Sequence, residues 1–331
     1  CRMLIAQPKG SGFHVVDSFS KSVQLGAGLE KTGRLSRGSM TRTIQALRIC
    51  QQKLRRNKVR RMRLVATEAC RRAANGAEFM QRIQRETGLK LDIIKPEEEA
   101  QLAVISCAPL VNRKTHNLLV VDIGGGSTEL VWIDISKVPK ADRAQSIMRL
   151  HGGFHQAKTD VPAARVVDWI SVPLGVATLR DQFSDVEDDA ARFALMSWFF
   201  EENLTDFTPY QSIQSQDRFQ IVGTSGTVTT VAASHLGLKR YDRTKVDGLR
   251  MTSAQIDKVI HSYLAMGPGG RRADPRIGLD RQALIMSGAA ILQALMRCWP
   301  TDRLSVADRG LREGLLYAQM SADGVLEEGL G

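Results

Sequence analysis

The sequence is poor in the residues that build metal centres, disulfide frameworks and stacking surfaces. It has five cysteines and six histidines among 331 residues, and aromatic residues make up only 5% of the chain. The cysteines are odd in number and lack CxxC spacing, and no HExxH pattern occurs, which argues against a disulfide framework and a zinc site. The low aromatic content disfavours a stacking module for nucleic acid. These absences favour a protein of the reducing cytoplasm without a specific nucleic-acid partner.

Long apolar runs are also absent. No segment approaches the roughly 20 apolar residues that cross a bilayer, and no signal peptide opens the chain, so no membrane partner is expected. Neither GxxxxGK[ST] nor GxGxxG occurs, which argues against a P-loop and a dinucleotide turn. Positive charge is abundant instead: the net charge is +11, with 43% hydrophobic residues. Such a chain can build one large or two ordinary domains, and its charge favours anionic partners.

The most informative stretch, Val120 to Trp132, reads as a strand, a three-glycine turn and a second strand. Glycines can take positive φ and admit a ligand to the backbone, and successive N–H groups can form an anion-binding nest with added hydroxyl donors. The residues of this predicted nest are Gly124, Gly125, Gly126, Ser127 and Thr128. Asp122 and Glu129 flank it, which makes sense if a divalent cation lies between them and phosphate oxygens. A tight hairpin with glycines for turn geometry is the alternative.

A second glycine-rich turn follows the apolar strand expected at residues 219–222 and precedes a helix expected at 228–235. A strand followed by such a turn and a helix N-terminus is a ready anion site. The residues of this second predicted phosphate loop are Gly223, Thr224, Ser225, Gly226 and Thr227. A plain glycine turn with Ser225 or Thr227 as the helix N-cap explains the same pattern.

The order of the expected elements predicts a mixed α/β layer fold. Strands are expected at residues 1–6, 13–17 and 20–25 as a β-meander, and then at 63–66, 91–94, 166–172, 219–222 and 304–307 besides the hairpin. Helices are expected at 41–57, 67–87, 174–183, 188–203, 228–235, 280–296 and 308–319 and from Pro96 onward, with a surface excursion at 137–164 and a flexible loop at 267–270. Two similar α/β units joined near Asn117 predict domains at residues 1–116 and 117–331, with the ligand site in a cleft between them.

Two charged runs have an ordinary explanation. Lys53 to Arg63 carries Lys or Arg at seven of eleven positions, which suits a solvated helix end or, alternatively, a polyanion-binding patch. Pro96 opens a helix whose first turn holds Glu97, Glu98 and Glu99. Proline at the first position and acids beside the positive helix end need no functional role.

Six segments in this order together resemble the exopolyphosphatase/guanosine pentaphosphate phosphatase (Ppx/GppA) family, of the actin-like and sugar-kinase-like superfamily. The segments are Ala66–Asn75, Glu98–Leu102, Asp122–Leu130, Ser171–Gly175, Gly223–Thr227 and Asp308–Gly314. Each is weak alone, but jointly they cover nearly the whole chain. The resemblance implies an α/β fold of two RNase H-like domains that face each other across a cleft.

The resemblance also implies roles for particular residues. Asp122 and Glu129 resemble the family's magnesium site, and the two glycine-rich turns resemble its phosphate loops. Glu99 falls where the family carries its catalytic base, and Arg71 matches an arginine that faces the phosphates. The implied activity is hydrolysis of the terminal phosphoanhydride bond of inorganic polyphosphate, with Mg²⁺ as cofactor and guanosine pentaphosphate as the alternative substrate.

Two departures from the family pattern affect these expectations. Family members begin with a strand and a Gly-Ser/Thr-Asn loop before the position of Cys1, so the first phosphate site is expected to be truncated here. The chain ends soon after Gly314 and resembles the short two-domain form, whose closing helix can pack back on the first domain. A non-catalytic polyanion binder of the same fold and a homodimer both stay open. The helix of Glu99 and the closing segment speak against a kinase or chaperone ATPase.

Overall fold

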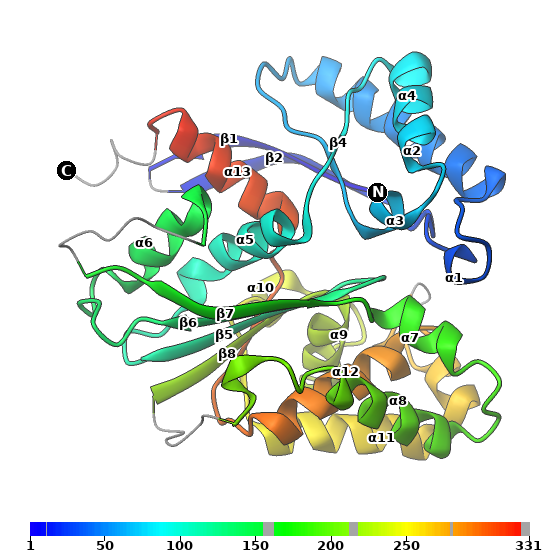
Figure 1. The fold of residues 1–331 in the computed structure, drawn as a ribbon, viewed down its shortest axis with the longest axis vertical. Helices are drawn as coiled ribbons and strands as arrows, with labels where there is room; N and C mark the ends of the chain where they lie inside the picture. Colours follow the sequence, from blue (N-terminus) through cyan, green and yellow to red (C-terminus); the bar gives the residue numbers. More distant parts are fainter. Residues whose placement is uncertain (11, 155–161, 212–217, 279–280, 326–331) are drawn as a thin grey trace. The chain divides into compact units, whose positions relative to one another are not determined.

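The computed structural model describes residues 1–10, 12–154, 162–211, 218–278 and 281–325, and its secondary structure is mixed α/β (Figure 1). The chain divides into two compact units. Unit 1 contains Cys1–Leu102 and Leu311–Gly331, and unit 2 contains Ala103–Gly310. The division falls inside helix α5 (Pro96–Cys107), whereas the sequence suggested a boundary at residues 116 and 117. The closing helix α13 (Leu311–Ala322) belongs to unit 1.

Unit 1 combines two short sheets with helices. Strands β1 (Arg2–Lys9) and β2 (Gly12–Ser20) form an antiparallel hairpin, and β3 (Val65–Ala66) pairs in parallel with β4 (Asp92–Ile93). The helices besides α5 and α13 are α1 (Leu29–Thr32), α2 (Arg37–Arg56), α3 (Glu68–Arg72) and α4 (Gly76–Thr87). Apolar side chains recur on one face of α2 at three- and four-residue spacing, at Ile44, Leu47, Cys50 and Leu54. They share a buried core with Phe79 and Ile83 of α4.

The predicted third strand at residues 20–25 is wrong. Pairing of β1 with β2 ends at Ser20, where the N–H of Lys21 donates to the carbonyl of Cys1. Gln24 then takes a left-handed conformation with φ of 47°, and its carbonyl accepts from the N–H of Ala27 in a turn. Val23 is buried, so the apolar pattern reflects core packing without a strand partner.

The single helix predicted at residues 67–87 is also wrong, since α3 and α4 are separated at Ala73–Asn75. The cause is a long-range side-chain contact. The buried amide of Asn75 accepts from the N–H of Leu35 at 2.8 Å and donates to its carbonyl at 3.0 Å. The backbone reverses so tightly there that a Cβ on Gly76 would clash with the carbonyl of Cys70. Local helix propensity cannot reveal such a contact.

Unit 2 is built on a six-stranded sheet in the order β7-β6-β5-β8-β10-β9. Its strands are β5 (Asn117–Ile123), β6 (Thr128–Asp134), β7 (Arg165–Val172), β8 (Phe219–Thr224), β9 (Arg250–Met251) and β10 (Leu304–Ala307). β7, β6 and β5 are antiparallel neighbours, β5, β8 and β10 run parallel, and β9 is antiparallel to β10. If β9 is left aside and the other five strands are numbered in chain order, their order across the sheet is 3-2-1-4-5. This is the RNase H-like order.

One face of this sheet packs on a large helical layer (Figure 1). The layer contains α7 (Val176–Gln182), α8 (Asp189–Glu202), α9 (Gly226–His235), α11 (Ser253–Ala273) and α12 (Ile285–Cys298). Trp132 stacks on Phe219 with ring centroids 5.1 Å apart, and Trp299 of the helical layer packs on Trp132 at 6.2 Å. Central strand β5 is buried on both faces from Leu118 to Val121, as its unbroken apolar run predicts.

The remaining differences lie in connecting segments. The expected excursion at residues 137–164 contains α6 (Arg143–Met148) and the short 3₁₀ helix η2 (Arg149–Gly152), and its residues 155–161 lie outside the described residues. The predicted loop at 267–270 is a kink inside α11, where Gly267 has φ of 61° and Pro268 continues the helical path. Helix α12 starts at Ile285; the expected start at residue 280 lies outside the described residues. Also present are η1 (Ala108–Leu110), η3 (Thr208–Gln211) and α10 (Arg243–Val246).

Candidate phosphate-binding and catalytic site

A row of polar side chains crosses four neighbouring strands of the unit 2 sheet. Ladder partners in register are Ser171 with Glu129, Glu129 with Asp122, and Asp122 with Thr224. Ladder partners point to the same face of a sheet, here the face opposite the helical layer that Val121 and Leu130 enter. The row lies where β5 and β8 end, and ligands bind at the carboxyl ends of parallel strands in open α/β sheets.

The turn from Gly124 to Ser127 joins β5 to β6, and its carbonyl groups are occupied by helix α7. The N–H groups of Val176 and Ala177 donate to the carbonyls of Gly124 and Gly125 at 3.0 and 2.8 Å. The N–H of Gly124 is also used, because it donates to the carbonyl of Ser127 at 2.9 Å. Among the residues that the structure describes, the N–H groups of Gly125, Gly126 and Ser127 donate to no acceptor. The turn thus has unused N–H donors, whereas its carbonyl acceptors are already hydrogen-bonded, as an anion site requires.

The structure changes the reason for glycine in this turn. None of the three glycines has positive φ, so turn geometry does not demand them. A Cβ on Gly124 would lie 2.8 Å from the carbonyl oxygen of Ser127, which explains that position by crowding. At Gly125, by contrast, no described atom lies within 4 Å of a Cβ position. The open space at Gly125 supports close approach of a ligand to the backbone.

The two hydroxyl groups of the turn have protein partners. Ser127 Oγ donates to Glu129 Oε1 at 2.6 Å, and Thr128 Oγ1 donates to the carbonyl of Leu174 at 2.7 Å. Both side chains are buried. In this structure their protons orient protein groups, whereas the sequence suggested donation to an anion.

Asp122 and Glu129 have the chemistry and the placement of a Mg²⁺ site. They are direct cross-strand partners, so their carboxylates share one face at one level of the sheet. Glu129 is 2% exposed, and hydroxyls of Ser127 and Ser171 both donate to its Oε1, at 2.6 and 2.9 Å. Among the described residues no group of three or more His, Cys, Asp or Glu side chains could hold a metal. Two carboxylates fit Mg²⁺, which takes few protein ligands and completes its shell with water and substrate phosphates.

The second glycine-rich turn connects β8 to α9. Ser225 is the N-cap of α9 and accepts from the N–H of Thr227 at 3.2 Å. Thr224 Oγ1 donates to the carbonyl of Arg309, and Thr227 packs so closely on α12 that a Cβ on Gly288 would clash with its Oγ1. These contacts fix the turn at the N-terminus of a ten-residue helix. The first N–H groups of that helix carry partial positive charge.

Ser225 has φ of 126°, a conformation rare for a residue with a side chain. Such backbone costs about 1–3 kcal/mol and persists where the surroundings impose it, often at binding sites. Neighbouring Gly226 has its Cα covered by the guanidinium of Arg281, since a Cβ there would overlap that group. The strain at Ser225 favours the functional interpretation of this turn over a plain glycine turn.

In unit 1, the structure brings together Glu99 and Arg71. Glu99 lies in the first turn of α5, and its Oε2 accepts from Arg71 Nη1 at 2.8 Å. The same guanidinium donates from Nη2 to Glu68 Oε2 at 2.8 Å and from Nη1 to the carbonyl of Ile94 at 2.8 Å. The side chains of Glu99 and Arg71 are each 14% exposed. A largely buried arginine is thus shared between two carboxylates.

The two charges perturb each other in the expected sense. Burial raises the pKa of Glu99 above its ordinary value, although the hydrogen bond and charge of Arg71 act to lower it. The negative charge of Glu68 raises the pKa of Glu99 further. Burial acts to lower the pKa of Arg71, but the carboxylates of Glu99 and Glu68 outweigh it and raise that pKa. Burial therefore prevails over the hydrogen bond and charge of Arg71 at Glu99, and a raised pKa suits a base that works near neutral pH.

Sequence reasoning missed several residues that this geometry includes. Ser171 and Gly175 lie inside a segment that carried the family resemblance, but the position of Ser171 beside Glu129 depends on the pairing register of β6 with β7. Glu68 stands three residues before Arg71, the spacing of a helical ion pair. Arg281 has no local signal, because its position over Gly226 depends on the packing of α12 against α9.

The basic run from Lys53 to Arg63 begins in the last turn of α2 and continues past its end, and its charge is partly neutralised. Lys53 pairs with Asp17 at 2.7 Å, Arg61 pairs with Asp323, and Arg63 pairs with Glu98. Within the described part of the chain, no helix is both long and apolar enough to cross a bilayer.

The RNase H-like strand order of unit 2, with phosphate-loop candidates after its first and fourth strands, defines the actin-like class of two-domain proteins. The family model described as the Ppx/GppA phosphatase family matches residues 4–323. The chain belongs to the Ppx/GppA phosphatase family.

Individual relatives agree with this assignment. The chain is 27% identical over 315 residues to a guanosine-5'-triphosphate,3'-diphosphate pyrophosphatase of Aeromonas salmonicida, covering 95% of this chain and 56% of that protein. The chain thus spans a little over half the length of this curated relative. The crystal structure of the Aquifex aeolicus family member has a TM-score of 0.74 at 29% identity, covering 97% of this chain and 94% of the other. An exopolyphosphatase-like protein has a TM-score of 0.78 at 26% identity, covering 96% and 93%. The predicted family and fold class are confirmed.

Proposed function

We propose that this chain hydrolyses the terminal phosphoanhydride bond of a polyphosphorylated substrate. The proposal rests on the turn from Gly124 to Ser127. N–H groups of this turn donate to no described acceptor, its carbonyls accept hydrogen bonds from α7, and two carboxylates lie beside it. Backbone N–H groups of this turn would donate to phosphate oxygens, and the N-terminus of α9 would serve the neighbouring phosphate. Phosphoryl transfer needs mainly such positioning and charge neutralisation.

The metal and the base complete the proposal. Asp122 and Glu129 would hold Mg²⁺, which when bound neutralises charge on the phosphates and on the leaving oxygen. Glu99 would accept a proton from water as the water oxygen bonds to the terminal phosphorus and the bridging P–O bond breaks. Arg71 donates to Glu99 and fixes the orientation of its carboxylate; a further contact of Arg71 with phosphate would strengthen binding.

Two substrates fit this chemistry. The name of the Aeromonas relative favours guanosine pentaphosphate, and the name of the exopolyphosphatase-like structure favours inorganic polyphosphate. The net charge of +11 supports capture of a long polyanion. The five cysteines are all free thiols, which supports a reducing cytoplasmic location.

The decisive experiment measures orthophosphate release from guanosine pentaphosphate and from long-chain polyphosphate, each with Mg²⁺ and with a chelator. We expect Mg²⁺-dependent release from at least one of them, and the ratio of the two rates identifies the substrate. Tight binding of both compounds without any release would replace the hydrolase by the non-catalytic polyanion binder.

A further inference from the structure

Arg143, in the first turn of α6, carries a buried charge without a carboxylate partner. It is 3% exposed, and it donates from Nε to the carbonyl of Val138 at 3.2 Å and from Nη1 to the carbonyl of Arg113 at 2.6 Å. Among the described residues it forms no ion pair. Burial, followed by repulsion from Arg218, lowers the pKa of Arg143. Carbonyl dipoles satisfy part of the guanidinium but leave its net charge uncompensated, a costly arrangement for a buried group.

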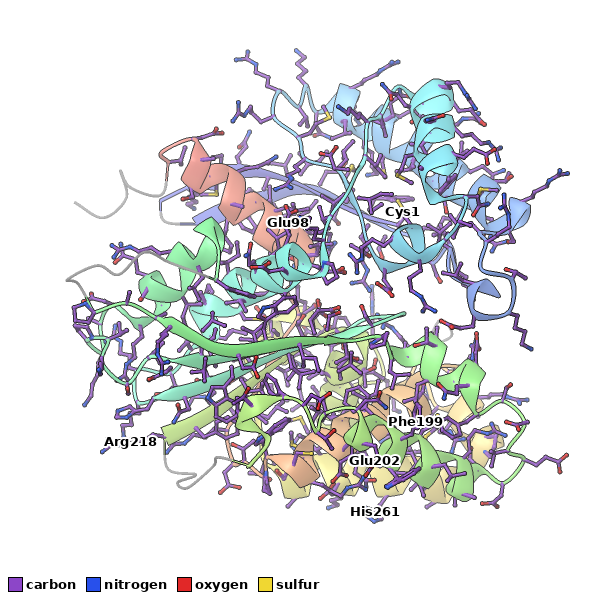
Figure 2. All side chains as sticks on the ribbon, in the orientation of Figure 1. Cys1, Glu98, Phe199, Glu202, Arg218 and His261 are labelled. Carbon is purple, nitrogen blue, oxygen red and sulfur yellow. The ribbon has the colours of Figure 1, made fainter. Side chains whose placement is uncertain are left out.

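Arg218 and His116 lie at the end of the sheet where β8 and β5 begin, marked in Figure 2 by the labelled Arg218. Arg218 Nη1 lies 3.4 Å from His116 Nε2. A guanidinium can only donate, so this ring nitrogen accepts and the imidazole is neutral with its proton on Nδ1. Burial, Arg218 and Arg143 lower the pKa of His116, in that order, and Lys140 adds to the effect.

Among the residues that the structure describes, Asp134 is the carboxylate that opposes these charges, and it is already engaged. Asp134 raises the pKa of His116. Its Oδ1 accepts from the N–H of Ser136 at 2.8 Å, and its Oδ2 pairs with Arg165 at 3.3 Å. A partly buried arginine can bind both oxygens of a carboxylate, as Arg309 does with Asp247 at 3.0 and 3.2 Å. Within the described part of the chain, the cluster therefore has no carboxylate left over to balance its charge.

We propose that Arg143, His116, Arg218 and Lys140 form a second anion site, which takes a phosphate group. Arg218 and Lys140 are exposed, His116 is half-buried and Arg143 is buried, so an anion can reach the first three side chains from solvent. Guanidinium groups match phosphate oxygens in geometry and charge. Asn117 and Asp122 are separated by five residue steps of β5, about 17 Å, so this cluster is separate from the polar row. The proposal does not depend on the proposed hydrolysis.

Free orthophosphate and the residues of a polyphosphate chain present the same chemistry to this cluster. A compact site for the free ion would bind both, whereas a site that needs contacts along a chain would bind only the polymer. Binding must therefore be measured with free phosphate and with polyphosphate separately. Either ligand, if it saturates the site, supports the proposal and identifies the source of the phosphate.

The test follows the imidazole signal of His116 by NMR in the full chain. Sodium phosphate and medium-chain polyphosphate are each titrated at constant ionic strength, with chloride as the reference. We expect a saturable shift, and a raised pKa of His116 in the bound state because the anion offsets Arg218, Arg143 and Lys140. Arg218→Gln should weaken binding about tenfold to a hundredfold, through loss of charge-assisted hydrogen bonds. Because Arg218 is exposed, this variant tests the site even if Arg143→Met does not fold.

The matched control is Lys258→Gln, which removes one exposed positive charge from α11. It should bind phosphate and polyphosphate like the parent chain. Equal losses in Arg218→Gln and Lys258→Gln would reduce the effect to general charge attraction and overturn the site. A His116 signal that responds to phosphate and polyphosphate no more than to chloride would overturn it as well.

Discussion

Arg71 and Glu99 form an ion pair in unit 1, with 2.8 Å between Nη1 and Oε2 and each side chain 14% exposed. The pair separates Glu99 from the other two glutamates of its helix turn. Glu98 pairs with Arg63 on the surface, and Glu97 contacts Gln101 at 3.5 Å. Among the three, Glu99 has the burial and the hydrogen-bonded orientation that a general base needs.

Glu99→Gln is therefore expected to reduce turnover by roughly 100- to 10,000-fold, because the amide keeps the size of the side chain but cannot take a proton. Substrate binding should persist. Steady-state release of orthophosphate and equilibrium binding measure the two quantities. Glu97→Gln is the matched control and should stay within about twofold of the parent chain. Equal losses in the two variants would reduce Glu99 to one acid of a charged helix start, worth about 0.3–1 kcal/mol.

Arg71→Met should move the acidic limb of the activity profile to higher pH. Burial already raises the pKa of Glu99 above 4.5, and Arg71 is the main group that opposes this rise. Without Arg71 the base stays protonated to a higher pH, so activity near the acidic limb falls. Arg72→Met is the control, because Arg72 pairs with Glu30 in place of Glu99. An unchanged acidic limb in Arg71→Met would show that Glu99 does not set it.

The same pKa shift predicts the sign of a stability change. Glu99 binds its proton more tightly in the folded chain than in the unfolded chain, since its folded pKa is raised. Its contribution to folding is therefore fully present below the unfolded pKa and lost as pH rises through the folded pKa. Glu99→Gln should remove this dependence. Chemical denaturation across that pH range checks it, and a parallel pH dependence of the parent chain and the variant would contradict the shift.

Asp122→Asn should raise the Mg²⁺ concentration needed for half-maximal activity at least about tenfold, a loss seen even for outer-shell partners of metal ligands. The fold should survive, because the amide can occupy the same place on β5. Activity and calorimetric binding of Mg²⁺ measure the effect. Asp206→Asn, an exposed carboxylate of unit 2, is the charge-matched control. Identical Mg²⁺ curves for the parent chain and Asp122→Asn would remove Asp122 from the site.

Gly175→Ala should displace the turn from Gly124 to Ser127, because the added Cβ would clash with its carbonyl groups. A Cβ at position 175 would lie 2.5 Å from the carbonyl oxygen of Gly124 and 2.6 Å from that of Gly125. We expect a loss of about 1–3 kcal/mol in the free energy of unfolding, together with weaker phosphate binding. Gly152→Ala, where no described atom lies within 4 Å of the Cβ, should be neutral in both measurements. A stable Gly175→Ala variant with normal phosphate binding would contradict the tight packing of α7 on the turn.

Much of the fold was predictable from local pattern. The strand before each glycine-rich turn and the helix after Pro96 follow from apolar runs and breakers, and the structure has them within a few residues. The errors arose where distant contacts decide. The amide of Asn75 reaches Leu35 and interrupts the predicted helix, and the segment after Ser20 is apolar for burial rather than for pairing.

The site was predictable in composition but not in detail. Motif spacing selected the turns and the carboxylates, yet it could not show that the hydroxyls of Ser127 and Thr128 point to protein acceptors. The family resemblance implied separate roles for Arg71 and Glu99, although they are hydrogen-bonded partners. Such pairings depend on rotamers and on the approach of distant segments, which one-dimensional spacing does not contain.

The polar row of the unit 2 sheet also disfavours incorrect strand register in that sheet. Successive side chains of a strand alternate between faces, so a slip of β6 by one residue would exchange the environments of Glu129 and Leu130. The carboxylate would then enter the apolar helical layer, and burial of a charge among apolar side chains is costly. Chains that pair their strands incorrectly would be unstable and open to proteolysis. The residues proposed to bind metal and phosphate would thus act during folding as a check on strand register.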